Sequence, residues 1–179
     1  MKTWNVALRM FLVLTLLTGV AYPLLVTGIA QALWPAKAGG SLITINGEVV
    51  GSTLIAQKFE KDIYFHPRPS ATDYNASASS GSNKGPTNTD LKKIYDDGVA
   101  AHILPEMIFS SASGLDPQIS PIAARAQLER VATARGLTAP QKGTLRQLLA
   151  TAVEERDLGF LGEARVNVLR LNMKLDEIF

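Results

Sequence analysis

The sequence predicts an α+β protein: a single amino-terminal transmembrane helix followed by one compact extracytoplasmic domain with a small sheet and several helices. Two patterns lead to this fold class. An uncharged apolar run opens the 179-residue chain, and short β-branched segments then precede segments with helical periodicity. The predicted division places the cytoplasmic tail and membrane helix in residues 1–36 and the domain in residues 37–179, with a polar loop at 66–89.

Composition excludes several classes of protein. Eighteen basic and sixteen acidic residues give a net charge of +2, which is too small for a nucleic-acid binder that relies on a basic surface. The chain has no cysteine, so disulfide scaffolds, thiolate metal sites and cysteine nucleophiles are ruled out. His66 and His102 are too few and too far apart for the histidine metal motifs. The sequence therefore predicts neither a nucleic-acid partner nor a metal site.

The apolar run is long enough to cross a membrane. Met10–Ala36 spans 27 residues without an acidic or basic side chain, or about 40 Å as a helix against a hydrocarbon core of about 30 Å. Trp4 and Trp34 bracket the run, as aromatic rings do at membrane interfaces. The alternative is a cleaved signal peptide, whose apolar core has about 7–15 residues. The length therefore favours an uncleaved anchor.

Charges at the two ends of this span predict its orientation. Lys2 and Arg9 precede it and Lys37 alone follows it closely, so the positive-inside bias keeps the short tail in the cytoplasm and places the domain outside. Gly19 and Gly28 leave room for close packing against another membrane helix. The anchor is thus expected to contact membrane partners as well as lipid.

After the anchor, three segments have the composition of strands: Leu42–Asn46, Val49–Phe59 and Ile63–Phe65. Asn46-Gly47 is a two-residue turn signal, which predicts a hairpin between the first two. A helix is expected from Asp90 to about Ala101.

The stretch from residue 66 to 89 is unusually polar. It holds 24 residues without Leu, Ile, Val, Phe or Met, and 16 of them are Ser, Thr, Asn, Gly or Pro. A flexible linker is the alternative, but the turn-forming residues are of several kinds and Arg68 stands between two prolines. We therefore expect an ordered loop that presents main-chain groups and side chains to a partner. The candidate contact residues are Arg68, Ser70, Asn75, Gly81, Ser82, Asn83 and Gly85.

The second half of the chain reads mainly as helix. Glu106–Phe109 is a short strand candidate, and residues 110–117 are loop. Ser120-Pro121 is a strong helix start, which predicts a helix to Arg135. Thr138 and Gln141 form a capping box for a helix that reaches about Glu155. Residues 165–179 fit a strand or a helix, and we predict a helix.

No familiar catalytic motif is present. The chain lacks the P-loop, the nucleophile elbow and the zinc-protease pattern. Gly81–Gly85 resembles a phosphate cradle only weakly, because no strand precedes it and no helix opens from it. Ser113 has no evident histidine base nearby in sequence. Gln127 and Arg130 point from one helix and are assigned to the surface.

Three long blocks resemble the C subunit of the Kdp-type potassium-transporting ATPase. They read YFHPRPSATDYNASASSGSNKGPTN, then SASGLDPQIS followed by AQLERVATARG, and then LGFLGEARVNVLRLNMKLD. The resemblance covers nearly the whole chain and includes one amino-terminal membrane helix.

This resemblance implies a non-catalytic accessory subunit of a high-affinity, ATP-driven potassium uptake pump of the inner membrane. Its partners would be a channel-like potassium-binding subunit and a P-type ATPase subunit. The family is described as a catalytic chaperone that raises the ATP affinity of the ATPase subunit, with a nucleotide contact through Gln127 near Ser113 and Gly114. No cofactor is expected to bind stably, and ATP would be met only through the complex. Direct contact conflicts with the predicted orientation, because ATP is cytoplasmic.

Two other classes stay open at this point. A membrane-anchored binding module unrelated to transport requires an aromatic-lined groove, and only 7% of the residues are aromatic. A serine hydrolase requires a base within reach of Ser113.

Overall fold

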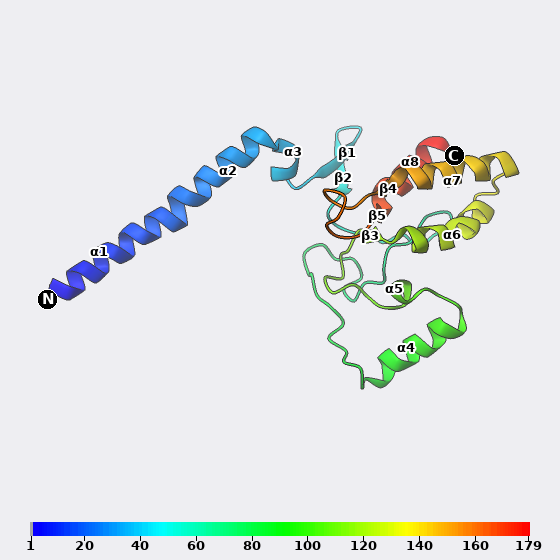
Figure 1. Ribbon diagram of the computed structural model, residues 1–179, viewed down its shortest axis with the longest axis horizontal. Coiled ribbons are helices and arrows are strands. Elements are labelled where there is room, and N and C mark those ends of the chain that lie inside the picture. The colour runs from blue at the N-terminus through cyan, green and yellow to red at the C-terminus, as the bar shows by residue number, and fades with distance from the viewer. Residues whose placement is uncertain (1) are drawn as a thin grey trace. The chain divides into compact units, whose positions relative to one another are not determined.

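The computed structural model describes residues 2–179. The chain divides into two compact units, one extending to Val50 and one from Gly51 to Phe179. The division predicted at residue 36 follows the end of the apolar run, whereas the first unit also includes the residues from there to Val50. The mixture of helices and small sheets confirms the predicted α+β class (Figure 1).

The first unit contains one helix long and apolar enough to cross a membrane. It runs from Lys2 to Leu33 as α1 (Lys2–Leu16), η1 (Leu17–Ala21) and α2 (Tyr22–Leu33), and an 18-residue window within it has a mean hydropathy of 2.0. The π-helical turn η1 lies just before Pro23, which has no N–H and crowds the carbonyl four residues earlier. The wider turn therefore accommodates the proline without ending the helix.

A short helix and a hairpin follow the span. They are α3 (Pro35–Ala38), β1 (Leu42–Ile45) and β2 (Glu48–Ser52). Asn46 and Gly47 have φ angles of +52° and +86°, as a type I′ turn requires, and the predicted hairpin is confirmed. The second strand ends at Ser52 rather than at the predicted Phe59.

In the second unit, helices pack with a three-stranded antiparallel sheet in the order β3-β5-β4 (Figure 1). Val166 on the central strand pairs with Ile119 on one side and Val153 on the other. The elements are β3 (Gln118–Ile119), α6 (Pro121–Ala134), α7 (Ala139–Ala152), β4 (Val153–Glu154), β5 (Arg165–Asn167) and α8 (Val168–Ile178).

The core of this unit lies between the three helices and the sheet. Leu145, Leu171 and Leu175 are fully buried, and so is Phe65, which comes from an irregular segment far from them in sequence. Burial of such a side chain is worth about 1.5–3 kcal/mol. Phe65 therefore anchors the start of the polar loop to the core.

The predicted helix starts in this region are confirmed. Ser120 caps α6, and its Oγ accepts the Ala123 N–H at 3.1 Å. Thr138 forms the expected capping box, in which its N–H donates to Gln141 Oε1 at 2.9 Å. Helix α7 ends at Ala152, short of the predicted Glu155, because Val153 and Glu154 pair with β5 instead.

Residues 165–179 form a short strand and then a helix, so both of the conformations considered for this stretch occur, one after the other. β5 occupies Arg165–Asn167, and Asn167 then caps α8 through a bond of 3.1 Å from the Arg170 N–H to its Oδ1. The predicted helix is confirmed from Val168 onward.

Helix α4 (Thr89–Ala100) is also confirmed, with Asn88 as its cap. Two strand predictions are wrong. The segment Glu106–Phe109 lies mostly in a short helix, α5 (Pro105–Ile108), because Pro105 follows an extended Leu104 and starts a helical turn. Ile63–Phe65 joins no sheet, and side chains rather than a neighbouring strand bind its peptide groups.

Candidate functional site

The polar loop at 66–89 is ordered against the loop at 110–117. The Ser80 N–H donates to Ser113 O at 3.0 Å, and the Ser111 N–H donates to Pro69 O at 3.2 Å. Ser79 Oγ also donates to Ser113 O at 3.0 Å. We call these two segments together the polar surface. Its backbone bonds support the predicted order over the flexible-linker alternative.

Ser70 is the centre of this arrangement. Its Oγ donates to Gly114 O at 2.6 Å and accepts the Thr72 and Tyr74 N–H groups at 3.1 and 2.9 Å. The Tyr74 hydroxyl in turn donates to Arg68 O at 2.9 Å. A single hydroxyl thus links both segments of the polar surface.

Gly114 allows the two segments to approach closely. Its φ angle is +67°, and a Cβ there would lie 2.8 Å from both Ser80 O and Thr72 Oγ1. Real Cβ contacts are not that short, and an L side chain disfavours this backbone conformation. Gly81 is similarly close, since its Cβ would meet Ala112 O at 3.0 Å.

Arg68 lines a cavity of about 440 Å³ at the edge of the polar surface. Its Nη1 lies 3.5 Å from Asp116 Oδ2, a long ion pair, and among the described residues its buried Nε has no hydrogen-bond partner. The guanidinium therefore keeps donor capacity free. Other residues lining the cavity include Glu106, Gln118, Ser120, Glu163 and Arg165.

The other predicted contact residues lie on the outer rim of the polar surface. Asn75 Oδ1 accepts the Ser77 N–H at 3.1 Å in a local turn. Asn83 has a φ angle of +54°, and Gly85 O accepts the Asn88 N–H. Asn75, Ser82, Asn83 and Gly85 are exposed, whereas Arg68, Ser70 and Gly81 are half-buried at the base.

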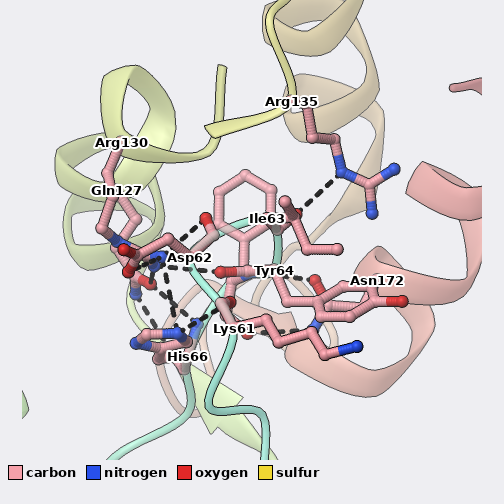
Figure 2. A network of polar contacts seen from close by, with 10 residues as sticks. Lys61, Asp62, Ile63, Tyr64, His66, Gln127, Arg130, Arg135 and Asn172 are labelled. Carbon is pink, nitrogen blue, oxygen red and sulfur yellow. Dashed lines mark hydrogen bonds and ion pairs between the residues drawn. The ribbon is translucent and has the colours of Figure 1, made fainter. Parts of the chain in front are cut away.

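Gln127 is not a surface residue, contrary to our assignment. It is 9% exposed, and its side-chain amide pairs with the backbone of His66 (Figure 2). Oε1 accepts the His66 N–H at 2.7 Å and Nε2 donates to His66 O at 3.1 Å. Arg130 Nη2 donates to the same Oε1 at 2.7 Å.

This geometry bears on the nucleotide contact that the resemblance implies. The acceptor Oε1 of Gln127 already receives two donors, and its amide nitrogen holds the His66 carbonyl. Ser113 and Gly114 are joined to Ser70 and Ser80 instead. The amide of Gln127 therefore holds the start of the polar loop, with two donors on its Oε1 and one of its two amide N–H groups on His66 O.

Sequence reasoning missed Asn172. This residue is 1% exposed; its Oδ1 accepts the Phe65 N–H and its Nδ2 donates to Phe65 O, both at 2.9 Å (Figure 2). It thus replaces the strand partner that the segment lacks. A signal was present, because Asn172 stands on the apolar helical face that includes Val168 and Leu175.

Two arginines also bind the backbone of residues 62–64. Arg130 Nη1 and Nη2 donate to Asp62 O at 2.8 Å and Tyr64 O at 3.0 Å, and Arg135 Nε donates to Ile63 O at 2.8 Å (Figure 2). Burial, with the Arg130 charge beside the ring, lowers the pKa of His66 below its usual value. The imidazole is therefore neutral near pH 7.

A family model described as KdpC, the K+-transporting ATPase c chain, matches residues 4–177. The chain belongs to this family. Three relatives, each named Potassium-transporting ATPase KdpC subunit, match over nearly their full length. That of Geobacter sulfurreducens is 49% identical over 190 residues, covering 99% of this chain and 99% of the relative. The Polaromonas naphthalenivorans protein is 52% identical, and the match covers 96% of this chain and 93% of the relative. The Rhodospirillum rubrum protein is 49% identical, and the match covers 100% of this chain and 97% of the relative.

As a member of the KdpC family, the chain is a subunit of a multi-subunit potassium-transporting ATPase, which implies partner subunits. The helix Lys2–Leu33 gives such a subunit one membrane span.

The hydrolase alternative finds no support in the surroundings of Ser113. Its Oγ accepts the Leu115 N–H at 3.1 Å. Within residues 2–179, no hydrogen bond joins Ser113 to a histidine or a lysine, and His66 Nε2 lies beside Lys61 O and Arg130. Among residues 2–179, Ser113 is therefore hydrogen-bonded to no histidine or lysine that could act as its base.

The two glycines of the membrane helix offer a test of the span as an assembly element. Among the described residues, nothing lies within 4 Å of a Cβ at Gly28, and a Cβ at Gly19 meets only Thr15 Cγ2 at 4.0 Å. Gly19→Leu and Gly28→Leu therefore fit the helix itself. We expect both variants to lower the amount of partner subunit that co-purifies in mild detergent, because close helix packing needs small residues.

The matched control is Ala7→Leu, another small-to-large change on the same helix. Full retention of the complex by both glycine variants would contradict the role of these positions.

Proposed function

We propose that the chain is the non-catalytic subunit that assembles and steadies the pump from outside the cytoplasm. In this proposal the polar surface contacts the channel-like subunit that binds potassium. The observation that supports it most is that the polar surface combines exposed donors and acceptors with a rigid backbone. A partner that binds such a surface does not have to order a flexible loop first.

The orientation rests on the charges flanking the span. Lys2 and Arg9 stand on one side of Met10–Ala36, with Lys37 alone following closely on the other. Moving Arg9 to the centre of the membrane would cost about 2.5–3.5 kcal/mol. The basic end therefore stays at the cytoplasmic face of the inner membrane, with the domain outside.

In the proposal, the effect on ATP is indirect. ATP is cytoplasmic, and Gln127 uses its amide to hold His66. By binding one conformation of the channel-like subunit better than another, the polar surface favours the pump state in which the ATPase subunit binds ATP tightly. The chain thus raises ATP affinity as a chaperone of the complex, with no nucleotide contact of its own.

Arg68→Ala tests the polar surface. The Arg68–Asp116 pair is long and partly exposed, so its loss costs at most about 1 kcal/mol of unfolding free energy. We expect potassium-limited growth to fall and the KM of the pump for ATP to rise, while the melting temperature of the full chain changes little. Arg68→Lys rescues poorly, because an ammonium group lacks the planar five-donor fork.

The matched control is Arg146→Ala, which removes an exposed arginine paired with Glu129 at 3.0 Å. It is expected to leave growth and ATP affinity unchanged. Equal losses of growth and stability in Arg68→Ala would instead mean that this part of the loop is structural.

A further inference from the structure

A short turn between β4 and β5 exposes three large apolar side chains. The turn consists of residues 156–162, and we call it the apolar turn. Leu158, Phe160 and Leu161 are 82%, 69% and 48% exposed. Single exposed apolar residues are ordinary, but three within four positions form a patch of the kind that marks an interaction site.

The apolar turn is held firmly. Asp157 and Leu161 exchange two backbone hydrogen bonds of 2.9 Å, and the Phe160 N–H donates to Asp157 O at 3.3 Å. The Asp157 carboxylate also accepts hydrogen bonds from both terminal nitrogens of Arg165, at 3.3 and 3.4 Å. The backbone that carries the three side chains is therefore held in place before any partner arrives.

The backbone of the turn is strained at the residue that is most exposed. Leu158 has a φ angle of +54° and Gly159 one of +82°. Consecutive positive angles are ordinary for Asn-Gly, but a bulky leucine disfavours this conformation. A strained conformation of an exposed apolar residue adds nothing to the fold, and such outliers concentrate at functional sites.

The charges around the turn indicate what kind of surface covers it. Residues 154–165 contain four carboxylates, Glu154, Glu155, Asp157 and Glu163, against two arginines. Arg165 pairs with Glu154 and Asp157, and Arg170 from α8 also pairs with Glu154. Elements that insert into a membrane surface commonly combine apolar residues with Lys and Arg. The rim of the apolar turn has no such excess of basic charge, so its apolar tip instead suits a shaped apolar pocket on a protein.

We infer that the apolar turn is a docking plug: Leu158, Phe160 and Leu161 enter an apolar pocket on another protein subunit of the pump. The inference rests on membership of the pump complex and uses neither the proposed orientation nor the effect on ATP. It concerns a surface outside both segments of the polar surface.

Leu158→Asn separates binding from folding, because asparagine tolerates a positive φ angle better than leucine. We expect the melting temperature of the full chain to stay equal or rise. In contrast, the rate at which partner subunits dissociate from the tagged, detergent-purified complex should rise by at least about tenfold, since interface variants act mostly on dissociation. The control is Ile122→Asn, at a residue that is 64% exposed on α6, which should leave the rate unchanged.

A photo-crosslinking residue at position 160 identifies the occupant in cells that express all subunits. Crosslinks to another subunit of the pump, absent when the probe is at position 122, support the docking plug. Crosslinks only to lipid or to a second copy of this chain would overturn it, and so would a wild-type dissociation rate in Leu158→Asn. A negative result for the apolar turn does not change the result expected for Arg68→Ala, so the two proposals can be rejected independently.

Discussion

Replacing Asn172 with leucine is expected to lower the free energy of unfolding by about 2–5 kcal/mol, because two buried peptide groups lose their partners. Leucine has the same branched shape and is larger than asparagine, so no cavity accounts for the loss. The Phe65 N–H and C=O both bond to the Asn172 amide at 2.9 Å, and no neighbouring strand replaces it. The loss should appear in chemical denaturation of the full chain followed by circular dichroism.

Lys174→Leu on the exposed side of the same helix is the matched control, and it should change stability by less than about 0.5 kcal/mol. An Asn172→Leu variant as stable as the wild type would show that the bonds to Phe65 contribute nothing. In that case the anchoring of residues 62–66 would rest on the buried Phe65 ring and on the bonds from Gln127, Arg130 and Arg135.

Gly114→Ala is expected to open the polar surface. Alanine at a φ angle of +67° costs about 1–2 kcal/mol, and its Cβ would also meet the backbone oxygen of Ser80 at 2.8 Å. The bond from the Ser80 N–H to Ser113 O should therefore break. We expect faster hydrogen exchange at the Ser80 amide and a large loss of potassium-limited growth.

Gly143→Ala is the matched control, and it is expected to have the opposite effect on stability. This glycine lies inside α7, and apart from its chain neighbours and the helix's own backbone no described atom is within 4 Å of a Cβ there. The substitution should stabilise the chain by about 0.5–1 kcal/mol without affecting growth. Normal Ser80 exchange in Gly114→Ala would mean that the two segments do not depend on their close approach.

The features predicted correctly from sequence are those set by neighbouring residues. Ser120-Pro121, the Thr138–Gln141 box and the Asn46-Gly47 turn each act within four residues, and the structure contains all three. Ile63–Phe65 was misassigned for the converse reason. Its β-branched and aromatic residues favour a strand, but its backbone partners are the side chains of Asn172, Arg130 and Arg135, more than sixty residues away.

The same contrast applies to the candidate site. Turn chemistry indicated an ordered loop at 66–89, and Arg68 lines a cavity there. The spacing of Gln127 from Ala124 and Val131 places it on the buried face of α6, but nothing local indicated what its amide would bind there. Its role became visible only when the fold brought His66 beside it. Long-range pairing of side chains with backbone is the part that periodicity does not encode.

The most direct test of the account is the location of the carboxyl terminus. Two fusions at Phe179, one to a reporter active only outside the cytoplasm and one to a reporter active only inside, report on which side of the membrane the domain lies. We expect activity from the outside reporter alone, because Lys2 and Arg9 stand before the span. Activity from the inside reporter alone would contradict it, and would make direct nucleotide binding through Gln127 the better mechanism.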